Sequence, residues 1–160
     1  MGFAKRADWT THIASTVRQI SSIMGLYSCF ESGGRTDAEM HLNSRKVWAK
    51  LEWEWDEPRE KRTEEIHKLA AASAGSTLCV FIGYSQDKYH EANLEKIRAA
   101  WGRAEKPLVV FLITFKLEGP WRYFDQLQTY SYSNSEMSLL REQPALPWMV
   151  KGSRWEMEGE

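Results

Sequence analysis

Polar and apolar residues alternate along the segment that reads Val47-Trp48-Ala49-Lys50-Leu51-Glu52-Trp53-Glu54-Trp55. A period of two is typical of a β-strand, whose successive side chains point to opposite faces. Glu52 and Glu54 are therefore expected on one face, and Trp53 and Trp55 on the other. A third carboxylate, Asp37, belongs to an alternating segment at residues 37–42, which predicts a neighbouring strand. Three carboxylates on adjacent strands are the ligands that a divalent cation prefers.

Patterns in the rest of the chain predict further helices and strands around the two strands that carry the carboxylates. Apolar residues at helical spacing predict a first helix over residues 9–24, with Asp8 as its N-cap. A short strand at 26–30 then completes an antiparallel meander with the two carboxylate strands. A second helix is expected over 59–74, after the helix-start signal Asp56-Glu57-Pro58.

The second half of the chain alternates strand and helix. Wholly apolar segments at 77–82 and 108–115 predict buried parallel strands, and the helix between them is expected over 87–103 with Ser85 as its cap. One more strand is expected within residues 123–132. We therefore expect an α/β fold with a mixed β-sheet flanked by helices. It forms a single domain over residues 1–143, and residues 144–160 are an irregular C-terminal tail.

Composition excludes several classes of protein. The chain has 160 residues, of which 42% are hydrophobic and 27% charged, and its net charge is −1. These values are ordinary for a globular domain and argue against strong non-specific nucleic-acid binding, although a local basic groove stays open. No apolar stretch approaches the length of a membrane span, and no signal peptide is visible. The two cysteines have no metal-type spacing. We expect a cytoplasmic protein that does not associate with membranes.

The carboxylates have two interpretations. If the strands pair in the matching register, Asp37, Glu52 and Glu54 meet and can hold Mg²⁺ or Mn²⁺, which would activate a water for attack on a phosphate. The alternative is a solvated strand face without chemistry, because half-buried strands ordinarily alternate in this way. Glutamate is depleted in strands, and two glutamates on one face repel each other, which favours the metal site.

The element order and the acidic residues resemble the PD-(D/E)XK, or restriction-endonuclease-like, nuclease superfamily. Its αβββαβ core carries an acidic residue on the second strand and an acidic–x–Lys triplet on the third. Thr36-Asp37 is similar to the first element and Glu52-Trp53-Glu54 to the second, and the resemblance covers residues 9–83. It implies Asp37, Glu52 and Glu54 as catalytic metal ligands, with an extra helix and strand after the core.

Two departures from the superfamily pattern concern catalysis. Thr36 stands where the pattern has proline, and Glu54 stands where it has lysine. Lys68, on the predicted second helix, is a candidate for the displaced cation, and Lys50 is an alternative. Basic residues expected to flank the site and hold backbone phosphates are Arg45, Lys46, Arg59 and Arg62.

The resemblance implies a metal-dependent phosphodiesterase, an endonuclease-like enzyme that acts on DNA or RNA. The alternative is a catalytically inactive domain of the same scaffold that binds nucleic acid or a protein partner. Near-neutral charge and the missing lysine favour this alternative. A homodimer, or fusion to a recognition partner, is expected if so small a domain cuts at specific sequences.

Overall fold

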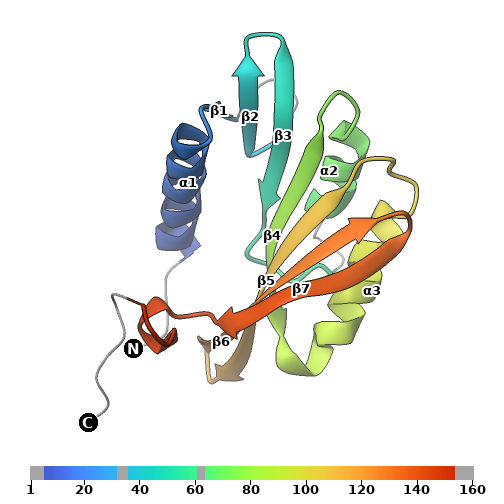
Figure 1. The fold of residues 1–160 in the computed structure, drawn as a ribbon. Helices are drawn as coiled ribbons and strands as arrows, with labels where there is room; N and C mark the ends of the chain where they lie inside the picture. Colours follow the sequence, from blue (N-terminus) through green and yellow to red (C-terminus); the bar gives the residue numbers. More distant parts are fainter. Residues whose placement is uncertain (1–5, 32–35, 61–63, 154–160) are drawn as a thin grey trace.

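A seven-stranded mixed sheet with helices on both faces makes up the part of the chain that the computed structural model describes, residues 6–31, 36–60 and 64–153 (Figure 1). The elements are α1 (Arg6–Ile23), β1 (Tyr27–Phe30), β2 (Ala38–Asn43), β3 (Lys46–Trp53), α2 (Glu65–Ala72), β4 (Leu78–Gln86), a 3-10 turn at Asp87–Tyr89, α3 (His90–Trp101), β5 (Leu108–Glu118), β6 (Trp121–Ser133), β7 (Glu136–Pro144) and a 3-10 turn at Pro147–Met149. The predicted α/β class is confirmed.

The strands lie side by side in the order in which they occur in the chain. β1, β2 and β3 form the predicted antiparallel meander, and β3, β4 and β5 are parallel. β5, β6 and β7 are again antiparallel. No element is predicted from the sequence at β7, because its side chains are mostly exposed and show little apolar pattern. Within the described residues no helix is long and apolar enough to cross a membrane.

Three apolar clusters form among the described residues: one around Tyr84, Phe115 and Phe124, and two on opposite faces of the sheet. Of these last two, one joins Ile13 and Val17 of α1 to Ala49 and Leu51 of β3. The other packs α2 and α3 against the opposite faces of β4 and β5 and contains the fully buried Trp101. Because side chains alternate along β3, the residues between Ala49, Leu51 and Trp53 point toward α2. Lys50 confirms this, since its Nζ donates to the Ala72 carbonyl oxygen at 2.7 Å.

The second helix starts later than predicted, at Glu65 rather than at residue 59. Tertiary hydrogen bonds hold the preceding segment in turns instead. The Glu57 carboxylate accepts from the Gln86 backbone N–H at 2.8 Å and from Asn93 Nδ2 at 2.7 Å, and the Arg59 backbone N–H donates to Asn93 Oδ1 at 2.9 Å. These partners lie far along the chain, so the local helix-start signal could not reveal them.

Both predicted side-chain caps are wrong. Asp8 lies within the first turn of α1 rather than before it. Ser85 belongs to β4, and its hydroxyl bonds to Asn93 Nδ2 and His90 Nδ1, each at 2.9 Å. The fully buried Asn93 therefore links Ser85 to the Glu57 segment, and this polar network fixes α3 against the sheet.

Candidate metal centre

Asp37 and Glu52 lie next to each other at one end of the β2–β3 pair. Ala38 is opposite Leu51 in this antiparallel pair, so one further step places Asp37 opposite Glu52. Asp37 Oδ2 also accepts a hydrogen bond from the Trp53 backbone N–H at 2.8 Å, which anchors the start of β2 to the end of β3. The register that the sequence left open thus brings these two carboxylates together, while their role as metal ligands stays a prediction.

Glu52 is a fully buried carboxyl group. Lys68 Nζ forms an ion pair with Glu52 Oε2 at 3.1 Å. Burial, followed by the charge of Asp37, raises the pKa of Glu52 from 4.5 to about 8 against the opposing effect of Lys68. Burial also raises the pKa of Asp37, while the Trp53 hydrogen bond opposes that rise. The pair is therefore costly to ionise without a nearby cation.

Lys68 is the cation that the fold supplies. It extends from α2 and pairs with Glu52 on the sheet and with Glu65 one turn earlier, at 3.1 and 2.5 Å. Partial burial lowers the pKa of Lys68, but its bonds and charge pairing with Glu65 and Glu52 outweigh burial and raise that pKa overall. The sequence analysis did not identify Glu65, although its three-residue spacing from Lys68 on a helix was an available signal.

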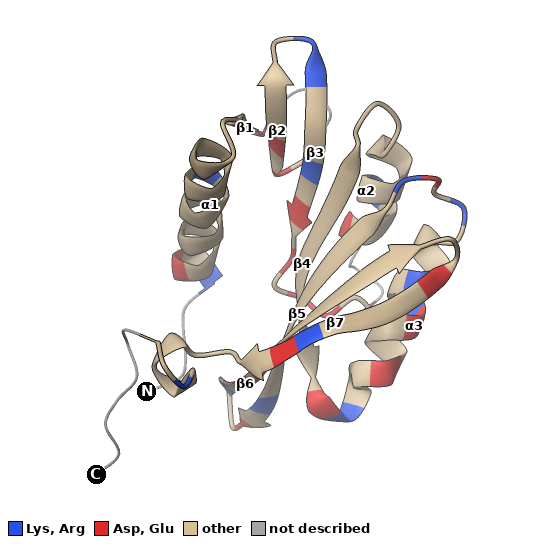
Figure 2. Ribbon diagram, viewed as in Figure 1, with Lys and Arg blue, Asp and Glu red and all other residues tan. Residues whose placement is uncertain are grey.

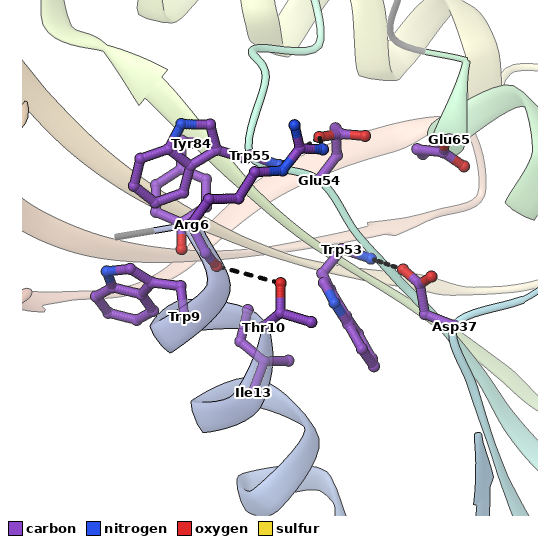
Figure 3. A pocket seen from close by; sticks show the side chains of 10 residues that line it. All are labelled: Arg6, Trp9, Thr10, Ile13, Asp37, Trp53, Glu54, Trp55, Glu65 and Tyr84. Carbon is purple, nitrogen blue, oxygen red and sulfur yellow. Dashed lines mark hydrogen bonds and ion pairs between the residues drawn. The ribbon is translucent and has the colours of Figure 1, made fainter. Parts of the chain in front are cut away.

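Glu54 does not lie beside Glu52 on β3, although the strand pattern predicted that it would. β3 ends at Trp53, so the strand alternation that placed Glu54 beside Glu52 stops one residue short. The Glu54 Oε1 atom accepts from Arg6 of α1 at 3.1 Å and from the backbone N–H groups of Trp55 and Asp56, at 2.6 and 3.1 Å. Glu54 still lines a pocket together with Asp37 and Glu65 (Figure 3).

Not all of the basic residues that were predicted to flank the site lie near it. Arg45 and Lys46 stand at the β2–β3 turn, while Glu52 is six residues further along β3, roughly 20 Å away at strand spacing. Figure 2 shows basic residues at the β2–β3 turn and acidic residues near the other end of β3, while Lys50 lies only two residues before Glu52 on that strand. The expectation that Arg45 and Lys46 flank the carboxylates is therefore wrong. Arg59 is engaged with Glu57 at 3.0 Å and lies over the Tyr89 ring at 3.7 Å. Arg62 lies outside the described residues.

Asp37 and Glu52 suit a Mg²⁺ ion that keeps several water ligands better than a metal ion whose ligands all come from the protein. Across residues 6–31, 36–60 and 64–153, no three His, Cys, Asp or Glu side chains are arranged to hold a metal ion. The predicted triad of Asp37, Glu52 and Glu54 is thus reduced to its first two members. Mg²⁺ commonly keeps several waters and uses one or two carboxylates with substrate phosphates. Asp37 and Glu52 are two adjacent carboxyl groups of this kind, and Lys68 Nζ lies 3.1 Å from Glu52.

Comparisons with known proteins assign no family. No protein-family model and no curated protein matches the sequence. The fold is similar to the YaeQ protein from Xanthomonas axonopodis pv. citri, with a TM-score of 0.35 and 12% identity over 74% of this chain and 70% of that one. It is also similar to the YaeQ protein from Pseudomonas syringae, with a TM-score of 0.34 and 9% identity over 74% and 68%. Likeness at this level leaves the family and the function of the chain open.

Proposed function

We propose that this protein is a metal-dependent phosphodiesterase that acts on nucleic acid. The observation that carries the proposal is the fully buried Glu52 carboxyl group beside Asp37, with Lys68 Nζ 3.1 Å from Glu52 Oε2. Two adjacent buried carboxyl groups are costly to ionise, and ionisable groups with strongly shifted pKa values are often found at functional sites. Asp37 and Glu52 would hold Mg²⁺ or Mn²⁺ between them.

A bound cation would supply charge to a scissile phosphate and lower the pKa of a coordinated water. The chain's own residues set the remaining roles. Lys68 keeps its proton because its pKa is raised, so it can neutralise developing negative charge or protonate a leaving oxygen, and it does not serve as a base. The described hydrogen bonds of the Glu54 side chain all end on Oε1, which would leave Oε2 to orient a water in the shared pocket.

The test is a cleavage assay with plasmid, single-stranded DNA and RNA in Mg²⁺, Mn²⁺ or EDTA. Wild type should cut at least one of them in a metal-dependent manner, and Glu52→Gln and Asp37→Asn should each abolish cutting. Glu39→Gln is the matched control, because Glu39 shares the Asp37 face of β2 but pairs with His41 at 3.0 Å and Lys50 at 3.9 Å. Equal cutting by wild type and Glu52→Gln would refute the proposal.

A non-catalytic binding domain on the same scaffold is the second candidate. Lys68 already pairs with Glu52, whose pKa of about 8 keeps it largely protonated at neutral pH. That combination is also what a purely structural buried pair would show. This candidate predicts no cutting and no rise in melting temperature with Mn²⁺, whereas the enzyme predicts stabilisation by Mn²⁺ that Glu52→Gln removes.

A further inference from the structure

A small pocket opens beside Asp37, between the N-terminal half of α1 and the ends of β3 and β4 (Figure 3). Its volume is about 210 Å³, and Asp37 and Glu65 lie on one side of it. Trp9, Trp53 and Trp55 form much of the remaining wall. Pockets for drug-sized ligands commonly reach about 300–1,000 Å³, so this one suits a single planar ring system.

Tyr84 and Trp9, two residues that line the pocket, each carry a polar group that lacks a hydrogen-bond partner among the described residues. Tyr84 is 1% exposed, and its hydroxyl has no hydrogen-bond partner among the described residues. The same holds for the indole Nε1–H of Trp9. Burial raises the pKa of Tyr84, so the hydroxyl stays protonated and can donate. Both atoms are buried behind the pocket surface, so a ligand that brings hydrogen-bond acceptors would reach them only after the lining side chains shift.

A second hollow adjoins the first. It measures about 480 Å³ and shares Asp37, Trp53 and Thr10 with the smaller pocket, then continues along α1 to Arg18. The Arg18 guanidinium lies over the Phe30 ring at 5.4 Å and provides a positive charge there. Asp37 and Trp53 therefore stand where the two hollows meet.

Trp53 is the residue best placed to stack on a ligand. The ring of Trp55 already carries the Arg122 guanidinium at 4.3 Å and packs on Tyr84 at 4.8 Å. Trp53 forms no aromatic ring pair among the described residues; it is half-buried and packs partly against the core that contains Ile13 and Val17. Aromatic rings that stack on successive bases beside a path for the backbone are how proteins bind single strands.

We infer that the 210 Å³ pocket takes an unpaired nucleobase next to the scissile phosphate, so that the substrate is single-stranded nucleic acid. Trp53 stacks on the base, the Tyr84 hydroxyl and Trp9 Nε1–H donate to its acceptors once the lining side chains shift, and the adjoining hollow receives the neighbouring nucleotide. A duplex cannot enter, because its bases are paired and stacked. The inference rests on the proposed phosphodiesterase, since the phosphate between the two nucleotides must reach Asp37.

Binding can be measured apart from cutting, by fluorescence anisotropy of a labelled single-stranded oligonucleotide in Ca²⁺ and in EDTA. Trp53→Leu should weaken binding by roughly 5- to 150-fold, the range for one base–aromatic stack. Tyr84→Phe should weaken it by about 2- to 12-fold without lowering the melting temperature, because it removes one neutral hydrogen bond to the ligand only. Trp48→Leu, on the same strand but outside both hollows, should leave binding unchanged.

The outcomes separate this inference from the proposed function. Unchanged affinity in Trp53→Leu, or equal affinity for the matching duplex, would overturn the pocket assignment even if metal-dependent cutting persists. Equal affinity for a free mononucleotide would assign the pocket to that ligand and overturn the single-strand substrate. Absent cutting together with Trp53-dependent binding would refute the phosphodiesterase while leaving a base pocket.

Discussion

Replacing Glu52 by Gln should remove most of the pH dependence of stability between pH 5 and pH 8. In the folded protein Glu52 keeps its proton up to about pH 8, whereas the unfolded chain releases it near 4.5. Between these values the folded state binds more protons, so raising the pH favours unfolding. Gln matches the protonated acid in shape and cannot ionise. The variant should therefore equal wild type at low pH and exceed it at pH 8.

The size of this effect follows from the shift in pKa. The difference between 4.5 and about 8, at about 1.36 kcal/mol per unit, sets a ceiling of about 5 kcal/mol. Water entering the site and adjustment of the half-buried Lys68 reduce it, so we expect about 2–4 kcal/mol between pH 5 and pH 8. Lys68 keeps an ion-pair partner in the variant, because Glu65 remains 2.5 Å from it.

The assay is urea unfolding followed by tryptophan fluorescence at half-unit steps of pH in EDTA. Glu95→Gln, an exposed position on α3, is the control and should run parallel to wild type. Asp37 contributes in the same direction, since its pKa is also raised, so a shallow slope should persist in Glu52→Gln. If the unfolding free energies of wild type and Glu52→Gln change with pH in the same way, the raised pKa of Glu52 is contradicted.

Three further substitutions test the surroundings of the site. Lys68→Met removes the 3.1 Å partner of Glu52 and should cost about 1–3 kcal/mol at pH 8 in urea unfolding; an unchanged midpoint would contradict the pairing. Gly83→Ala should cost about 1–3 kcal/mol in thermal unfolding, because a Cβ there would lie 2.8 Å from Phe81 Cε1; a neutral result would show that the ring moves freely. Asn93→Leu removes three buried hydrogen bonds and should cost about 2–4 kcal/mol, with faster amide exchange in residues 56–60; unaltered exchange would argue against the anchoring role.

The two strands that carry Asp37 and Glu52 could be predicted because both alternate clearly and a short turn joins them, whereas the register that places these residues opposite each other comes only from the structure. Glu54 could not be placed from the same pattern, since nothing local shows that the strand ends at Trp53 and gives way to a turn capped by the Glu54 carboxylate. The start of α2 depends on contacts between Glu57 and Asn93, 36 residues apart, which local signals do not encode. The positions of side chains on strands could therefore be predicted from the sequence, whereas those of side chains on the connecting segments could not.

Metal binding at Asp37 and Glu52 is tested most directly by an anomalous difference map from a crystal soaked with Mn²⁺ at pH 8, where about half of the Glu52 carboxyl groups are ionised. The account predicts a single strong peak within coordination distance of both Asp37 and Glu52, and its absence in Glu52→Gln crystals. No peak at this pair in wild type, with Lys68 still bound to Glu52, would contradict the assignment of a metal-dependent phosphodiesterase.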